Sequence, residues 1–269
     1  MGIDLSSHEP WDLVAKGYSE ITMAVFQGYT DAALAMVNLD SQSRILDLAC
    51  GPGTLALTAA KDVDQVKAVD FSREMIGILN HTLESEGIKN IETWCGDGQA
   101  LPFEDNSFDA AFSMFGLMFF PDRMKGYREI FRTLKPGGVV VISSWAPLSD
   151  SPLQQAVFGA LREMMPSMPK PQQNVESLEN PEFFREEMTK AGFKDVRIEP
   201  VSCGTEITSI DSFWEDTVKG AAPLVMVKNS MTEEQWREKS KIALDYLQKT
   251  IGDSKNLSAQ AWLGYGVKG

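Results

Sequence analysis

The sequence predicts an α/β fold in which helices cover both faces of a mainly parallel sheet. The first observation is an alternation of short apolar or β-branched runs with helical patterns between residues 44 and 145, which is typical of βαβ units. The second is the punctuation of that alternation. Ser72 can cap a helix that begins at Arg73, Gly87 can end it, and a Pro-Gly-Gly run at 136–138 separates a later helix from the next strand.

The elements follow in order along the chain. Five strands are expected at residues 44–49, 66–69, 90–94, 108–114 and 138–145. Helices are expected between most of them, at 54–61, 73–86 and 122–134, whereas the stretch between the third and fourth strands reads as loop. A helix at 182–191 and two further strands at 195–201 and 259–267 complete the pattern.

The flanking regions differ from this alternation. Residues 1–40 are expected to form an N-terminal helical lid in front of a main domain over residues 41–269. Two insertions flank the sixth strand: residues 146–180, before it, are rich in proline around one short helix, and residues 208–252, after it, have a helical pattern. We expect them to form a helical cap over one edge of the sheet.

Composition and charge narrow the partners. The chain has 269 residues and a net charge of −13, which disfavours nucleic acid and anionic membranes because both repel an acidic surface. The longest apolar run, 110–120, is too short to span a bilayer. Cys50, Cys95 and Cys203 form no paired motif, which favours reduced thiols and a cytoplasmic protein. No cluster has metal-ligand spacing, so no metal is expected, and the sequence does not predict an oligomeric state.

Two signals indicate a nucleotide-like ligand. The run Asp-Leu-Ala-Cys-Gly-Pro-Gly at 47–53 follows the first strand and precedes a helix, and glycines at such a turn let backbone approach a ligand closely. Asp70 ends the second strand, where a carboxylate can accept hydrogen bonds from a ribose. Gly51, Gly53 and Ala56 also fit a dinucleotide-binding pattern, so at this point an NAD(P)-dependent dehydrogenase remains an alternative.

A third set of motifs separates these interpretations. The run Gly-Asp-Gly-Gln-Ala-Leu-Pro-Phe at 96–103 follows the third strand, Asp-Asn-Ser-Phe-Asp at 105–109 leads into the fourth, and Leu-Lys-Pro-Gly-Gly lies at 134–138. With the first two signals, this ordered set resembles the class I S-adenosylmethionine-dependent methyltransferases, in the small-molecule branch of the ubiquinone/menaquinone-biosynthesis (methyltransferase type 11) family. The resemblance implies a Rossmann-like three-layer α/β/α sandwich with a seven-stranded, mainly parallel sheet whose last strand is antiparallel. It also implies S-adenosyl-L-methionine as cofactor and S-adenosyl-L-homocysteine as product.

The resemblance assigns roles residue by residue. It implies that Asp47 reaches the methionine amino group, that Asp70 holds the ribose hydroxyls and that Asp97 accepts from the adenine amino group. Ala49 departs from the family pattern, which often has glycine there. The expected cofactor-binding residues are Asp47, Ala49, Cys50, Gly51, Gly53, Asp70, Phe71, Ser72, Met75, Gly96, Asp97, Gly98, Ser113, Met114 and Phe115.

The chemistry then needs few catalytic side chains. Transfer of a methyl group from a sulfonium depends mainly on alignment of the reacting atoms, and a base is needed only for a protonated acceptor. No catalytic residue is assigned; His8 is a candidate base, with a mobile terminal residue as the alternative. The substrate-binding candidates, each of which could instead be a packing residue, are Trp11, Tyr18, Met118, Phe119, Trp145 and Trp214.

The predicted activity is therefore methyl transfer to O, N or C of a small, at least partly apolar molecule, by an enzyme without stable membrane anchoring. The fourth strand ends in Ser-Met-Phe-Gly at 113–116 and lacks the Asn/Asp-Pro-Pro-Tyr block of amino-group methylases that act on nucleobases or glutamine. Two alternatives stay open. One is a non-methylating relative that binds the same cofactor, as a cyclase, decarboxylase or regulator. The other is the dehydrogenase, although no Tyr-x-x-x-Lys pair follows the fourth strand.

Overall fold

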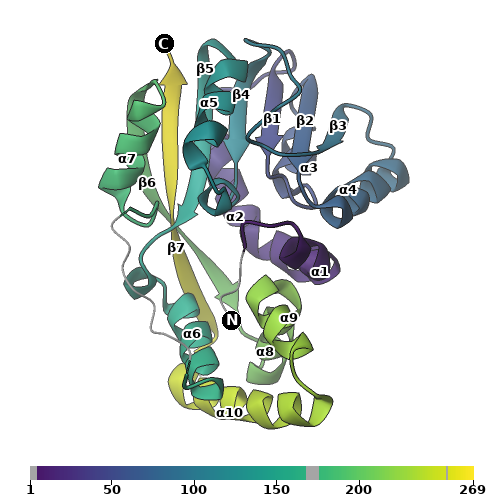
Figure 1. The fold of residues 1–269 in the computed structure, drawn as a ribbon, viewed down its shortest axis with the longest axis vertical. Helices are drawn as coiled ribbons and strands as arrows, with labels where there is room; N and C mark the ends of the chain where they lie inside the picture. Colours follow the sequence, from purple (N-terminus) through teal and green to yellow (C-terminus); the bar gives the residue numbers. More distant parts are fainter. Residues whose placement is uncertain (1–4, 168–175, 253) are drawn as a thin grey trace.

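A seven-stranded sheet forms the centre of the molecule (Figure 1). The computed structural model describes residues 5–167, 176–252 and 254–269. The ends of the predicted lid and cap insertion at 1–4 and 168–175 lie outside the described residues. The strands are β1 (Arg44–Leu48), β2 (Gln65–Asp70), β3 (Ile91–Cys95), β4 (Phe108–Ser113), β5 (Leu134–Trp145), β6 (Phe193–Glu206) and β7 (Asn256–Lys268).

The strand order is β3-β2-β1-β4-β5-β7-β6. Neighbours from β3 to β5 pair in parallel, and β7 runs antiparallel to both β5 and β6. The mainly parallel sheet with an antiparallel last strand is thus confirmed. The order reverses between β1 and β4, and open α/β sheets collect ligands outside the carboxyl ends of strands at such a point.

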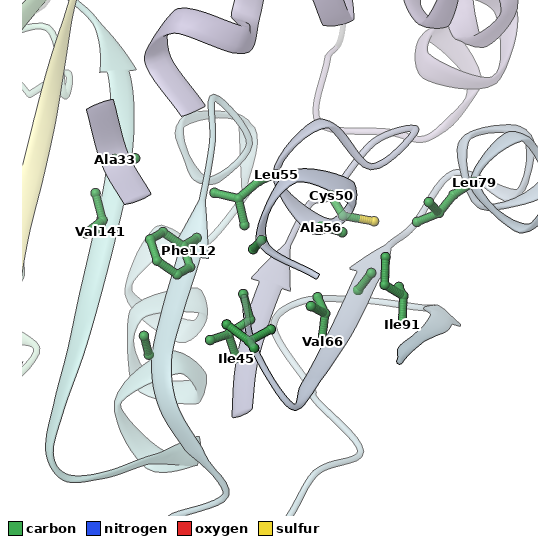
Figure 2. Packing of buried hydrophobic residues seen from close by; sticks show 14 of the residues in the cluster. Ala33, Ile45, Cys50, Leu55, Ala56, Val66, Leu79, Ile91, Phe112 and Val141 are labelled. Carbon is green, nitrogen blue, oxygen red and sulfur yellow. The ribbon is translucent and has the colours of Figure 1, made fainter. Parts of the chain in front are cut away.

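Helices cover both faces of the sheet because the strand side chains alternate between them. Ile45, Val66 and Phe112 face the layer of α2 (Met23–Ala35), α3 (Thr54–Ala59) and α4 (Arg73–Glu86), where they pack with Leu55 and Leu79 (Figure 2). The residues next along each strand, among them Leu46 and Ala111, face α5 (Arg123–Thr133) and α7 (Pro181–Lys190). The two helical layers and the sheet between them make up the predicted three-layer sandwich.

Local signals set the ends of two helices, and those at the two ends of α4 were predicted. Ser72 accepts a hydrogen bond from the Met75 backbone N–H at the start of α4, and Gly87 ends that helix with a left-handed backbone at φ +69°. Asp122 caps α5 through the Lys125 N–H. Residues other than glycine rarely adopt a positive φ such as that of Gly87.

Three strands, β5, β6 and β7, extend several residues beyond their predicted ranges. β6 and β7 continue as a two-stranded ribbon, with pairs from Ser202↔Gln260 to Glu206↔Asn256, so backbone pairing extends strands that have no sequence pattern of their own there. β5 begins at Leu134, which pairs with Phe108 across a register shift. The Pro-Gly-Gly run therefore lies within an irregular part of β5 and not before it.

The remaining helices form two groups. α1 (Glu9–Gly17), a π-helix at Tyr18–Thr22 and α2 make up the N-terminal segment. The cap consists of α6 (Pro152–Met164), α8 (Ile210–Gly220), α9 (Ala222–Asn229) and α10 (Glu233–Ile251), with short 3-10 helices at Leu117–Phe119 and Leu148–Asp150 elsewhere. Figure 1 shows the cap at the end of the molecule opposite the C-terminus, with α1 between it and the ends of β1 and β2. The cap has its own apolar core.

Candidate active site

A cavity of about 390 Å³ lies at the carboxyl ends of β1, β2, β3 and β4. Its wall comes from the N-terminal segment and from the loops that follow these four strands. The lining residues are Ser6, Ser7, His8, Trp11, Tyr18, Leu48, Ala49, Gly51, Val69, Asp70, Phe71, Met75, Gly96, Asp97, Gly98, Gln99, Met114, Phe115, Gly116, Phe119, Phe120 and Pro121. The wall is mostly apolar, and none of these residues is a lysine or an arginine.

The turn after β1 has a left-handed backbone. Ala49, Gly51 and Gly53 have φ values of +58°, +54° and +95°, a region that favours glycine. Ala49 is therefore a strained position, which gives a physical reason for the glycine common there in the resembling family. A Cβ on Gly116 would lie 2.2 Å from the Cβ of Ala49, so the loops after β1 and β4 touch where the strand order reverses.

Asp47 lies beneath this turn. Its side chain is buried, and Oδ2 accepts a hydrogen bond from the Ala56 N–H at 3.0 Å. Burial raises the pKa of Asp47 to about 7 despite that hydrogen bond. The carboxylate faces a second, small cavity of about 30 Å³, which Tyr18 and Gly51 also line; it does not line the large one.

The Asp70 side chain connects the turn after β1 to the turn after β2. Oδ2 accepts from the Gly51 N–H at 2.8 Å and Oδ1 from the Ser72 N–H at 2.9 Å. The side chain is 6% exposed, and burial raises the pKa of Asp70 to about 6, although both backbone hydrogen bonds lower it. A cation in the cavity would relieve this desolvation cost.

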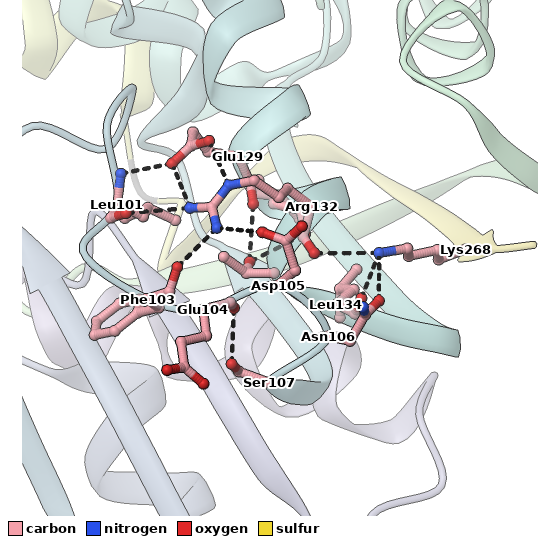
Figure 3. Close-up of polar contacts among 12 residues, drawn as sticks. Leu101, Phe103, Glu104, Asp105, Asn106, Ser107, Glu129, Arg132, Leu134 and Lys268 are labelled. Atoms are coloured by element: carbon pink, nitrogen blue, oxygen red, sulfur yellow. Dashed lines mark hydrogen bonds and ion pairs between the residues drawn. The ribbon is translucent and has the colours of Figure 1, made fainter.

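The loop after β3 is held by contacts that the sequence interpretation missed (Figure 3). Glu129 accepts from the Leu101 N–H at 2.7 Å, and Arg132 donates to the Leu101 and Phe103 carbonyls at 3.1 and 2.7 Å. Asp97, at the start of this loop, accepts from the Gln99 N–H at 2.8 Å. Glu129 and Arg132 belong to α5, where their spacing reads as an ordinary solvated helix pair, so no sequence signal pointed to this role.

Close packing also shapes the adjoining backbone. A Cβ on Gly98 would lie 2.7 Å from both Leu48 Cδ1 and Phe120 Cζ. Phe115 has φ +56°, and its N–H donates to the Ser143 hydroxyl at 2.8 Å. Ser113 is fully buried, and its hydroxyl has no hydrogen-bond partner among the described residues.

The N-terminal segment closes one side of the cavity. The His8 ring bonds Asp12 through Nδ1 at 2.7 Å, which raises the pKa of His8. Asp12 also accepts from the Ser72 hydroxyl at 2.6 Å and thereby fixes α1 to the start of α4. Trp11 contacts Phe119, with ring centroids 5.1 Å apart.

The structure brings together most of the predicted site residues but not all of them. Of the cofactor set, Ala49, Gly51, Asp70, Phe71, Met75, Gly96, Asp97, Gly98, Met114 and Phe115 line the large cavity, whereas Asp47, Cys50, Gly53, Ser72 and Ser113 lie behind its wall. Cys50 lines the small cavity with Asp47. Gly53 packs against Leu79, since a Cβ there would lie 2.5 Å from Leu79 Cδ1.

The substrate-binding candidates divide in the same way. Trp11, Tyr18 and Phe119 line the cavity. Trp214 does not: it is 2% exposed inside the cap, donates to the Ser240 hydroxyl at 2.5 Å and stacks on Trp236.

Trp145 and Met118 lie outside the wall as well. Trp145 packs with Phe26, Tyr29 and Phe115, and the Met118 sulfur accepts from the Ser144 hydroxyl. Both side chains are held by these contacts inside the protein and therefore do not border the cavity. No described residue of the two predicted insertions, 146–180 and 208–252, lines this cavity.

No group of three or more His, Cys, Asp or Glu side chains in residues 5–167, 176–252 and 254–269 is arranged to hold a metal ion. Within the same ranges, no helix combines the length and apolar character needed to cross a membrane.

Comparison with known proteins supplies independent information. Residues 18–211 match the ubiE/COQ5 methyltransferase family. A demethylmenaquinone methyltransferase from Bacillus pumilus is 27% identical over 221 residues, which cover 76% of this chain and 94% of that protein. Among solved structures, the YcgJ protein from Bacillus subtilis superposes with a TM-score of 0.59 at 19% identity, covering 89% of this chain and 97% of that one.

A second solved structure has the same fold. Phosphoethanolamine N-methyltransferase 2 from Haemonchus contortus, solved with S-adenosyl-L-methionine, has a TM-score of 0.58 at 22% identity and covers 96% of this chain and 57% of its own. The family match spans well over half of the chain. It contains the glycine-containing runs at 47–53 and 96–103 and the aspartates Asp47, Asp70 and Asp97, which decides against the dehydrogenase alternative. The chain therefore belongs to the ubiE/COQ5 methyltransferase family and is an S-adenosylmethionine-dependent methyltransferase that acts on a small molecule.

Proposed function

We propose that the large cavity binds S-adenosylmethionine between the turn after β1 and the loop after β3, and that the methyl group passes to a small, at least partly apolar acceptor. The observation that carries this assignment is the pair of buried carboxylates, Asp47 and Asp70, beside a wall without lysine or arginine. Buried carboxylates with raised pKa values favour a cationic ligand, because the ligand's charge offsets their desolvation.

The chain's own groups divide the binding between them. Asp70 is suited to hold the ribose, and Phe71, Asp97 and the Gly98 N–H are suited to the adenine. Asp47 acts on the methionine amino group from beneath the turn, across the small cavity that it shares with Gly51. The remaining cofactor residues that lie behind the wall support the backbone and do not touch the ligand.

Bound S-adenosylmethionine supplies a methyl group on a sulfonium that is already activated for displacement. The protein's contribution is then to align the acceptor and exclude water, and effects of this kind can be worth several kcal/mol. The close contact of the β1 and β4 loops at Ala49 and Gly116 fixes two sides of the site rigidly. Trp11 and Phe119 close a third side.

The acceptor is proposed to be an aromatic or otherwise apolar ring. Trp11, Phe119 and Phe120 provide the apolar wall, and the Bacillus pumilus relative is named for demethylmenaquinone. His8 is the residue proposed to take a proton from an acceptor that arrives protonated, because Asp12 orients its ring and the ring borders the cavity. The net charge of −13 supports an acceptor other than nucleic acid, and the cytoplasmic location remains a prediction.

A calorimetric titration with adenosylhomocysteine tests the cofactor assignment, with NAD as the comparison ligand. Binding of adenosylhomocysteine but not NAD is expected. Incubation with quinol and phenol acceptors, followed by detection of adenosylhomocysteine, then tests the acceptor class. If the folded protein binds no adenosine-containing compound, the assignment of the cavity is wrong. If adenosylhomocysteine binds but no apolar ring is methylated, only the acceptor class is wrong.

A further inference from the structure

The cap contributes no described residue to the cavity wall, yet it packs directly on the segment that does. Figure 1 shows α8 and α9 next to α1. Ala222 of α9 packs with Val14 and Ala15 of α1. The cap is therefore placed to act on the site through the N-terminal segment.

The end of α8 contacts the chain on either side of Tyr18, at Gly17, the last residue of α1, and at Thr22, the last residue of the π-helix. A Cβ on Gly17 would lie 2.1 Å from the Lys219 carbonyl oxygen, so only glycine permits this approach. At the other end of the π-helix, the Thr22 hydroxyl donates to the Gly220 carbonyl at 3.2 Å. We call this pair of contacts, Gly17 with Lys219 and Thr22 with Gly220, the α8 contact.

The chemistry of a helix end explains the α8 contact. The last carbonyls of a helix have no partner within it, and Lys219 and Gly220 are the final residues of α8. The Thr22 hydroxyl satisfies one of these carbonyls from another segment. A Cβ on Gly220 would lie 2.5 Å from Thr22 Oγ1, so both partners of the hydrogen bond depend on close approach.

The segment between these two points carries Tyr18. The π-helix runs from Tyr18 to Thr22, and the Met23 N–H bonds back to the Tyr18 carbonyl. Isolated π turns are uncommon and often occur at functional sites. The Tyr18 ring borders both cavities and lies over Gly51: its Cε1 is 4.0 Å from the position of a Gly51 Cβ. Burial and the charge of Asp70 raise the pKa of its hydroxyl, so the side chain stays uncharged beside the cavity.

We propose that Thr22 and Gly220 are positioning residues for the methyl-transfer site, through which the cap fixes the π turn and so places Tyr18 over the glycine turn. The inference rests on the proposed cofactor site, because Tyr18 matters only if a ligand lies at Gly51. It assigns to the cap a role in cofactor affinity without any contact to the cofactor.

The test is a double-mutant cycle with adenosylhomocysteine as the probe, measured by calorimetry on the full chain. Thr22→Val removes the hydroxyl at nearly constant volume and should weaken binding by about three- to tenfold, the range for one hydrogen bond. Thr22→Ser keeps the hydroxyl and should restore wild-type affinity. In a Tyr18→Ala background, Thr22→Val should change affinity by less than about twofold, because the ring that it positions is gone.

A matched control and a second variant complete the design. Thr217→Val makes the same change within the cap, where the hydroxyl donates to the Phe213 carbonyl of its own helix, and should leave affinity unchanged. Gly220→Ala disturbs the same hydrogen bond from the cap side and should reproduce the loss if Thr22→Val does not fold.

The results separate the two proposals. Unchanged affinity in Thr22→Val, or an equal loss with and without the Tyr18 ring, overturns the positioning role and leaves the cofactor site intact. A folded wild-type protein that does not bind adenosylhomocysteine overturns the cofactor site, and the positioning role with it.

Discussion

Cofactor affinity should depend on pH through the two buried carboxylates. Asp70 has a pKa of about 6 and Asp47 a pKa of about 7, both raised by burial. Only the ionised forms attract a cationic ligand, so binding should release protons and tighten as the pH rises from 5 to 7. Lowering the pH from 8 to 5 should weaken binding about tenfold if Asp70 alone faces the charge, and about a thousandfold if Asp47 does as well.

Calorimetric titration with S-adenosylmethionine, which carries the sulfonium charge, measures the effect across this pH range in the absence of an acceptor. In buffers of different ionisation enthalpy, the observed heat at pH 6.5 should vary with the buffer, because protons leave the protein on binding. His8 also titrates at the edge of the cavity and has a raised pKa, so His8→Gln separates its contribution. A dissociation constant that stays flat between pH 5 and 7 would show that neither carboxylate meets the ligand's charge, and the electrostatic argument would fail.

The same carboxylates should lower the stability of the ligand-free protein as the pH rises. Their folded-state pKa values lie above the ordinary value of 3.8, so the folded state holds more protons than the unfolded chain between about pH 4 and 7. The stability from this source is present below pH 4 and lost through that window. Asp47→Asn should therefore raise the melting temperature relative to wild type at pH 8 but not at pH 4, while weakening adenosylhomocysteine binding. An equal difference at both pH values would contradict the burial argument.

Three further predictions address packing. Gly116→Ala places a Cβ 2.2 Å from that of Ala49 and should lower the free energy of unfolding by about 1–3 kcal/mol and weaken cofactor binding. Ala49→Gly relieves a positive φ and should keep both the stability and the cofactor affinity. Equal losses of stability for the two variants in denaturant unfolding would refute this. Arg132→Ala frees the Leu101 and Phe103 carbonyls and should lower the melting temperature and weaken adenosylhomocysteine binding, an effect absent if the loop is rigid without it. Trp214→Phe loses the bond to Ser240 and should lower the melting temperature with cofactor and acceptor constants unchanged; a raised KM for the acceptor would restore Trp214 as a substrate contact.

The sequence by itself determined the sheet, its helical layers and the chemical class. Alternation of apolar runs with helical pattern is a local property, and it predicted all seven strands in order. The ends of α4 were predicted because Ser72 and Gly87 act on backbone groups within a few residues of themselves. The glycine turn and Asp70 were each predicted as ligand-binding features; because strands that run parallel end at one edge of the sheet they lie together, and the Gly51 N–H bonds to Asp70.

Only the tertiary structure decided which side chains face the cavity and how strongly the acids are perturbed. Trp11 and Trp214 both lie in helical segments and look equivalent in the sequence, yet one borders the cavity and the other fills the cap core. The ribbon of β6 and β7 forms only because the two strands pair over their full length. Burial of Asp47 and the docking of α8 on Tyr18–Thr22 depend in the same way on contacts between segments far apart in the chain, which no local pattern encodes.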